Sequence, residues 1–339
     1  MWKKIKIRTE SGREEDAQAP IIISASRSTD IPAFYSDWFV HRLKKGYLKW
    51  INPFNRKPLF VTFQKARVLV FWSKNPKPII KHLDFIKTII PNFYFQYTLN
   101  NYDAENLEVN VPSVDSRIDT FIELSNKIGK DKVIWRFDPL ILTDKINCVD
   151  LLEKIKYVGD KIHKYTDKLV FSFADIESYK KVKKNLLDNK INYKEFDEES
   201  MRFMAKGIQE LNKNWGLKIG TCAEAINLKE YGIEHNKCVD DDLMIKLFKD
   251  DEVLMKFLGV KLIKADIFGE EHIEKTKNLK DKGQRALCGC ISSKDIGEYN
   301  TCPHLCEYCY ANSSKELALK NWKLHKENPF SELINESPK

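Results

Sequence analysis

The sequence predicts an α/β fold with a parallel-strand (β/α) barrel, TIM-like or partial, and a cysteine-rich segment near its C-terminus. Short apolar runs rich in β-branched residues alternate with segments of helical periodicity, which is the pattern of a parallel sheet. Seven of the eight cysteines lie after residue 220. We therefore expect a barrel-like domain over residues 1–280, followed by a cysteine-rich cluster segment and C-terminal helix over residues 281–339.

The expected elements follow one another in regular order. The expected strands occupy residues 21–24, 68–72, 93–99, 133–137, 169–173 and 217–221. The expected helices occupy residues 33–45, 76–90, 113–128, 149–162, 176–187, 198–212 and 312–326. Runs of four to eight β-branched and aromatic residues are typical of buried strands, and the longer amphipathic segments are typical of the helices that connect them.

Polar and charged residues follow the expected strands. In (β/α) barrels the active site lies at the carboxyl ends of the strands, so these side chains would converge on one mouth. Arginine suits carboxylate or phosphate groups, and acidic residues suit amines or ribose hydroxyls. The candidate catalytic residues are Arg27, Asp30, Arg136, Asp138 and Glu224.

The same residues also suit structural roles. Asp30 precedes Pro32, a pattern typical of a helix N-cap. Arg136 lies within the apolar run 133–137, where a charge is costly unless it is paired, and Asp138 is a near partner. We interpret Arg136 as an internal anion-binding residue, with a structural Arg136–Asp138 ion pair as the alternative.

The motif Cys302-x3-Cys306-x2-Cys309 brings three thiolates into one short loop. Three thiolates can hold three irons of a four-iron, four-sulfur cluster and leave the fourth iron open. The alternative is a structural zinc site, which would need a fourth ligand such as His304, Cys288 or Cys290.

The remaining cysteines divide into one isolated residue and one group. Cys148 stands alone at an expected helix start and suits the role of a small buried hydrophobe. A second metal site, either an auxiliary iron-sulfur cluster or tetrahedral zinc, is predicted from Cys222, Cys238, Cys288 and Cys290. Free reduced thiols are the alternative for these four.

The three-then-two spacing resembles that of the radical S-adenosylmethionine enzymes, which commonly place an aromatic residue where Tyr308 stands. The resemblance implies that the open iron binds S-adenosylmethionine and that Tyr308 lies near its adenine. We assign Lys74 and Asn75 to cofactor binding with it. More narrowly, the chain resembles a bacterial family of unknown function with this C-terminal cysteine cluster, through residues 26–32, 71–76, 135–139, 222–224 and 295–312.

Two features depart from the radical enzymes. Their cysteine motif usually follows the first barrel strand, whereas here it lies near the C-terminus. A circularly permuted barrel would restore its spatial position. The sequence also lacks a Gly-Gly-Glu motif of the kind that those enzymes use to hold the methionine amino group.

The resemblance implies an iron-sulfur enzyme that generates a 5'-deoxyadenosyl radical and acts on a substrate that the sequence does not identify. Such an enzyme would take its electron from a low-potential flavodoxin or ferredoxin. An alternative substrate class is nucleic acid, as for photoproduct lyases. The non-enzymatic alternative is a binding or redox-sensing protein stabilised by zinc or a cluster.

Composition limits partners and location. The formal net charge of +8 arises from lysines scattered among acidic residues, including the run 180–184, and this pattern suits solvated helix faces at least as well as a nucleic-acid surface. The sequence contains no run of about 20 apolar residues and no apolar signal-peptide segment at its start. We therefore expect a cytoplasmic protein without a membrane partner.

Overall fold

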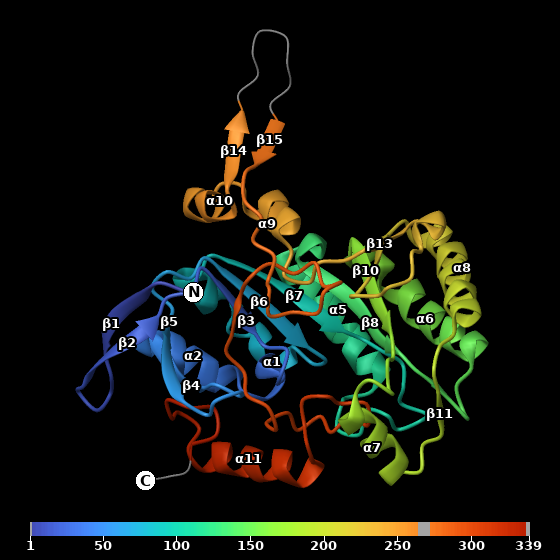
Figure 1. Cartoon of the computed structure of the whole chain (residues 1–339), viewed down its shortest axis with the longest axis horizontal. Helices are drawn as coiled ribbons and strands as arrows, with labels where there is room; N and C mark the ends of the chain where they lie inside the picture. Colours follow the sequence, from blue (N-terminus) through green and yellow to red (C-terminus); the bar gives the residue numbers. More distant parts are fainter. Residues whose placement is uncertain (1, 264–271, 337–339) are drawn as a thin grey trace.

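The apolar runs form an eight-stranded sheet at the centre of the computed structural model, which describes residues 2–263 and 272–336 (Figure 1). All neighbouring strands in this sheet run parallel. The strands, in spatial order, are β13 (Ile233–His235), β12 (Lys218–Thr221), β10 (Lys168–Phe173), β8 (Val133–Leu140), β7 (Asn92–Thr98), β6 (Val68–Ser73), β3 (Ile22–Ala25) and β16 (Lys294–Asp295).

The predicted α/β fold with a parallel sheet is confirmed, but a closed TIM-like barrel is not. Within the described residues, β13 and β16 form the two edges of the sheet and do not pair with each other. These edge strands are only three and two residues long, so they offer few hydrogen-bonding groups for closure. The central sheet is therefore open.

Helices cover the sheet, and most of them begin at a side-chain cap. Ser113, Asn147 and Asp197 each accept a backbone N–H at the start of α5, α6 and α8. The helices are α1 (Ile31–Phe34), α2 (Ser36–Lys45), α3 (Lys77–Ile80), α4 (Leu83–Ile89), α5 (Val114–Ile128), α6 (Cys148–Ile162), α7 (Lys180–Asp188), α8 (Glu198–Trp215), α9 (Asp241–Phe248), α10 (Glu252–Leu258) and α11 (Lys315–Glu327). None of the helices in the described residues has the length and apolar character needed to cross a membrane.

The two faces of the sheet pack against different parts of the chain, because successive side chains of a strand point to opposite sides. Phe71, Phe95 and Trp135 belong to the larger core, which includes buried residues of α2, α5, α6 and α8. Val70 and Tyr94 belong to a second core, formed with α9, α10 and the buried thiols of Cys238, Cys288 and Cys290. The second face therefore carries cysteine chemistry as well as apolar packing.

Several smaller sheets were not predicted from the sequence. One contains β1 (Lys4–Arg8), β2 (Glu14–Gln18), β5 (Pro58–Thr62) and β4 (Tyr47–Ile51), in that order. The other two are the pair β9 (Leu142–Thr143) with β11 (Tyr193–Lys194), and the hairpin of β14 (Val260–Ile263) with β15 (His272–Lys275). Figure 1 shows that this hairpin projects away from the central sheet.

The cysteine-rich segment contributes β16 to the central sheet, where it pairs with β3. Asp295, at the end of β16, binds the end of β3 and the loop that follows it. Its carboxylate accepts hydrogen bonds from Ser24 Oγ (2.9 Å), Ser26 Oγ (2.7 Å) and the Arg27 N–H (2.9 Å). Thus β16 attaches the cysteine-rich segment to the edge of the central sheet.

Gly297 lies two residues beyond Asp295 and packs directly on Ser26. A Cβ at position 297 would lie 2.0 Å from Ser26 Oγ and 2.6 Å from Ser26 Cβ. We predict that Gly297→Ala lowers the free energy of unfolding by about 1–3 kcal/mol through overpacking, as measured by denaturant unfolding. Gly283→Ala is the control, because its Cβ would meet only an Asp281 carboxylate oxygen at 3.3 Å. Equal stability of the two variants would contradict this interpretation.

Candidate metal and cofactor site

The loop after β16 carries the three-cysteine motif and docks on the loop that follows β7. The Glu307 N–H donates to the Leu107 carbonyl at 2.9 Å, in the middle of the motif. Cys306 is buried, and Cys302 and Cys309 are partly buried. Because the strands are parallel, both loops leave the same carboxyl edge of the sheet, which is the edge expected for a functional site.

The spacing of these thiols differs from that of ligands on one metal ion. With Zn–S bonds of about 2.3 Å, tetrahedral geometry places two thiolates about 3.8 Å apart. Among the described residues, the only set of three or more His, Cys, Asp or Glu side chains with all ligand atoms within 4.8 Å of one another is Asp240, Asp241 and Asp242. The three thiols of the motif therefore do not all lie within 4.8 Å of one another, so they do not form a compact site for a single ion.

Burial keeps the thiols of this motif protonated. It raises the pKa of Cys302 to about 12 and also raises the pKa values of Cys306 and Cys309. A metal ligand must be the thiolate, so binding of a metal group would release these protons. The donor set fits an iron-sulfur cluster that binds with proton release.

Asp30 joins three loops at this edge. Its carboxylate accepts the Ala33 N–H (3.0 Å) as the N-cap of α1, and it also accepts Ser73 Oγ (2.7 Å) and the Lys74 N–H (2.7 Å). His304 Nε2 lies 2.8 Å from the same carboxylate, within the cysteine loop. Asp30, a candidate catalytic residue, therefore positions the loops, and His304, the candidate zinc ligand, already has a partner.

A buried charge network lies beside the cysteines. Lys74 Nζ donates to Glu108 Oε1 at 2.7 Å and to the Tyr308 hydroxyl at 2.8 Å. Tyr308 also donates to Glu108, Asn100 Nδ2 donates to Glu108 at 3.1 Å, and Arg117 forms an ion pair with it at 3.1 Å. Burial alone would raise the pKa of Glu108, but the two cations outweigh it and lower this pKa to about 2.

The three predicted cofactor-binding residues separate into two groups. Lys74 and Tyr308 lie together in the buried network, and Lys74 Nζ is 5.1 Å from the centre of the Tyr308 ring. Asn75 lies instead in the turn before α3, where its N–H donates to Ser73 Oγ at 3.0 Å and its side-chain oxygen accepts from the Lys77 N–H at 3.4 Å. The structure thus brings two of the three together.

Two candidate catalytic arginines lie over one indole ring on the second face of the sheet. The guanidinium carbons of Arg27 and Arg136 are 4.9 Å and 5.3 Å from the centre of the Trp72 ring. Arg136 forms an ion pair with Asp138, which also accepts a hydrogen bond from Ser172. The ion pair that the sequence offered as the alternative for Arg136 is therefore present.

The four remaining candidate ligands meet on this second face, although they come from three segments of the chain. The thiols of Cys222 and Cys238 are 3.6 Å apart. Cys290 Sγ accepts the Cys238 N–H at 3.3 Å, and the thiols of Cys238 and Cys288 are close enough to lower the pKa of Cys290. The hydrogen bond with Cys238 lowers the pKa of Cys222 to about 6. We refer to Cys222, Cys238, Cys288 and Cys290 as the four-cysteine cluster.

Glu224, the last candidate catalytic residue, lies close to this cluster. Its carboxylate accepts the Phe173 N–H at 3.0 Å. Burial raises the pKa of Glu224 to about 7, and the nearby Asp138 and Cys222 act in the same direction. Glu224 therefore titrates near neutral pH, where a carboxyl group can exchange a proton.

Sequence reasoning missed the acid at the centre of the buried network and its second cation. Arg117 lies on α5 between Val114 and Ile118, at a position that faces the core. An arginine on the apolar side of an amphipathic helix was a readable signal of a buried ion pair. Glu108 lies in an irregular loop, so no periodicity marked it as buried.

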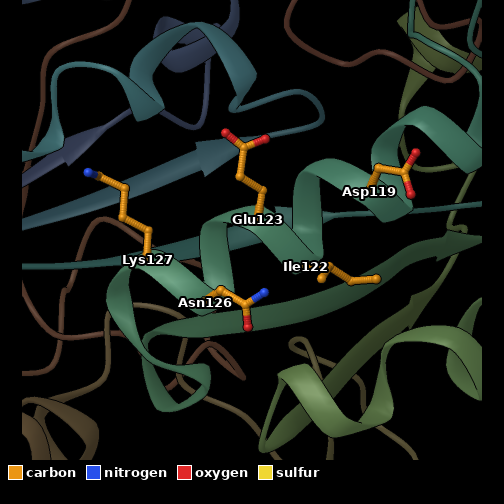
Figure 2. A pocket seen from close by; sticks show the side chains of 5 residues that line it. All are labelled: Asp119, Ile122, Glu123, Asn126 and Lys127. Atoms are coloured by element: carbon orange, nitrogen blue, oxygen red, sulfur yellow. The ribbon is translucent and has the colours of Figure 1, made fainter.

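A hollow lined by five residues of α5 lies elsewhere on the surface. Figure 2 shows that the side chains that line it all come from α5, and that they lie along the helix instead of converging on one point. Lys127 pairs with Asp84 at 2.8 Å, and Glu123 pairs with Lys77. This hollow is a shallow exposed depression and contains none of the candidate site residues.

Comparison with known proteins identifies a family but no activity. A family model described as "Domain of unknown function (DUF1848)" matches residues 22–311. No curated protein matches the chain. A crystal structure described as "a putative alpha-L-fucosidase from Bacteroides thetaiotaomicron VPI-5482" is 12% identical, and the match covers 67% of this chain and 79% of that chain. Its TM-score of 0.27 is too low to support an argument about fold or function.

Glu108→Gln tests the buried network. We predict a loss of about 3–5 kcal/mol in the free energy of unfolding, because Lys74 and Arg117 would remain buried without their anionic partner. The wild-type contribution is fully present above pH 4.5 and is lost as the pH falls from 4.5 toward 2, so the difference between variant and wild type should shrink in acid. Urea unfolding at several pH values measures this difference in the free energy of unfolding. Glu123→Gln, in an exposed pair with Lys77, is the control and should change stability by about 0.5 kcal/mol or less.

Glu224→Gln tests the raised pKa. The folded chain holds a proton up to about pH 7 that the unfolded chain releases near pH 4.5, so this group makes wild-type stability fall as the pH rises between these values. The variant, which cannot ionise, should gain stability relative to wild type at pH 8 and lose that advantage at pH 4. Denaturant midpoints at pH 4 and pH 8 measure this difference in stability. Glu153→Gln, at an exposed position of α6, is the control. A pH-independent difference would contradict the prediction.

Proposed function

The chain belongs to the family described as a domain of unknown function, DUF1848, and we propose that it is a radical S-adenosylmethionine-type enzyme whose iron-sulfur cluster is held by Cys302, Cys306 and Cys309. The observation that carries this proposal is the position of β16. It lies at one edge of an open parallel sheet, and the three-cysteine loop leaves its carboxyl end. Three thiolates in one loop, without a compact set of four ligands among the described residues, suit a cluster with one open iron better than tetrahedral zinc.

The strand order supports a circular permutation. β16 is the last strand of the chain, yet it lies beside β3, the first strand of the central sheet in sequence. In the radical enzymes that the motif resembles, the cysteines follow the first strand of the barrel. A permuted chain with β16 in that spatial position accounts for the late occurrence of the motif.

The residues of this chain would hold and shield the group. The three thiolates would ligate it, and, when bound, the cluster would supply the electron that cleaves S-adenosylmethionine. Glu307 and His304 fix the loop on its neighbours, and Tyr308 is buried within it, with an exposed fraction of 8%. Lys74 places a positive charge near Cys306, which favours the thiolate there.

The partners in this proposal follow from the reaction. A low-potential flavodoxin or ferredoxin would provide the electron, and a substrate would bind near the carboxyl edge of the sheet. Arg27 and Glu224 lie on the second face of the sheet and could bind anionic or cationic groups of that substrate. Nucleic acid is the alternative substrate class, and salt-dependent binding to DNA or RNA would reveal it.

The test is anaerobic reconstitution with iron and sulfide, followed by reduction with dithionite in the presence of S-adenosylmethionine. We expect wild type to form 5'-deoxyadenosine, measured by chromatography, and Cys306→Ala to form at least about a hundredfold less, because the cluster would lose one of its three ligands. Cys148→Ala is the control, since Cys148 lies at the start of α6, outside both cysteine groups.

The other outcomes separate the alternatives. An oxygen-sensitive cluster that forms but yields no 5'-deoxyadenosine would point to a redox-sensing protein. Zinc bound in place of iron, with no absorbance of a cluster, would overturn the enzyme proposal in favour of a zinc-stabilised binding protein.

A further inference from the structure

The four-cysteine cluster forms a continuous row of thiols although its members are far apart in sequence. Cys222 follows β12, Cys238 follows β13, and Cys288 and Cys290 lie in the segment before β16. The 3.6 Å separation of Cys222 and Cys238 is close to that of two ligands on one metal atom, about 3.8 Å. One disulfide uses two thiols, so it would leave two of these four unpaired.

The row is also too extended for a single ion. Among the described residues, no three of these thiols lie within 4.8 Å of one another. Cys222 and Cys238 have the spacing of two ligands on one metal atom, whereas the four thiols together are spread more widely. This arrangement matches a group that contains more than one metal atom. This spacing favours an iron-sulfur cluster over tetrahedral zinc.

Positive charge surrounds the row. Arg136 Nη1 donates to Cys238 Sγ at 2.9 Å. Arg27 also lies near this row, since Cys290, Asp295 and Cys238 are the groups that contribute most to raising its pKa. Arg27 Nη2 is buried and has no hydrogen-bond partner among the described residues. A buried guanidinium nitrogen without a hydrogen-bond partner is costly, and a nearby anion lowers that cost.

A metal centre with four thiolates supplies that anion. Four thiolates bound to Zn²⁺, or to an oxidised iron-sulfur cluster with a core charge of +2, leave a net charge of −2. Four neutral thiols would carry no negative charge. Asp138 partly neutralises Arg136, and Asp295 lies near Arg27, while Arg285 adds a further positive charge near Cys222 and Cys288. The charges of the surrounding protein therefore suit a thiolate centre.

Backbone and side-chain donors also point at the sulfur atoms. The N–H groups of Cys238 and Val239 approach Cys290 Sγ at 3.3 Å and 3.4 Å. Asn236 Nδ2 approaches Cys238 Sγ at 3.2 Å. Hydrogen bonds to ligating sulfurs are a common means of stabilising iron-sulfur clusters.

We propose that Cys222, Cys238, Cys288 and Cys290 bind a second metal centre, fully ligated by the protein and separate from the three-cysteine site, with an iron-sulfur cluster as its occupant. The second centre does not require that the three-cysteine site cleave S-adenosylmethionine. Because all four ligands come from the chain, no metal position is left open for a substrate. Its role is therefore structural or electron-transferring.

The test uses the full chain carrying Cys302→Ser, Cys306→Ser and Cys309→Ser, purified without oxygen, so that any metal found belongs to the second centre. Iron, acid-labile sulfide and zinc are measured per chain. We expect iron and sulfide to remain in this triple variant and to fall at least fivefold when Cys238→Ser is added. Addition of Cys148→Ser instead is the control and should leave the metal content unchanged.

A second measurement does not depend on whether Cys238→Ser folds. The triple variant is treated with iodoacetamide in oxygen-free native buffer, before and after the metal is removed with a chelator, and alkylation of each cysteine is read by mass spectrometry. We expect the four cysteines to be protected until the metal is removed and Cys148 to react in both conditions. Zinc in place of iron, with the same dependence on Cys238, would retain the centre and overturn the cluster as its occupant. Equal alkylation with and without chelator, together with absent metal, would overturn the second centre itself, whatever the outcome for 5'-deoxyadenosine.

Discussion

The attachment of β16 to β3 through Asp295 is the constraint on which the arrangement of this molecule depends. Only two residue pairs join the strands, so the carboxylate, with its bonds to Ser24, Ser26 and the Arg27 N–H, supplies much of the remaining connection. This attachment places the three-cysteine loop at the carboxyl edge of the sheet. It also fixes the loop that carries Arg27 between that site and the four-cysteine cluster.

Much of the fold could be predicted from local patterns, and the rest could not because it depends on distant partners. The six expected strands all occur in the central sheet, since buried parallel strands are near-continuous apolar runs. β13 and β16 were missed because two or three residues give no periodicity. Sheet closure could not be read from the sequence either, since it depends on how far the short edge strands extend.

The candidate site, like the fold, could be predicted only in part from the sequence. Cysteine spacing along the chain indicated the three-cysteine loop. The short Cys288-x-Cys290 spacing and residue type grouped the other four, which the structure brings together from three segments. The partners of Asp30 and Glu108 could not be predicted, because each carboxylate binds groups from loops after different strands. Such networks are a property of three-dimensional packing, and only the unusual position of Arg117 on an apolar helix face hinted at one.

The pairing of β16 with β3 also bears on the order in which the molecule is assembled. Ser24 and Asp295 are separated by 271 residues, so the edge of the sheet must wait for one of the most distant contacts in the chain. The strands from β3 to β13 leave the ribosome earlier and can pack first. Until β16 docks, the loop that carries Cys302, Cys306 and Cys309 lacks the contacts that bury these thiols in the folded chain. The docking of a two-residue strand therefore sets when these thiols become buried.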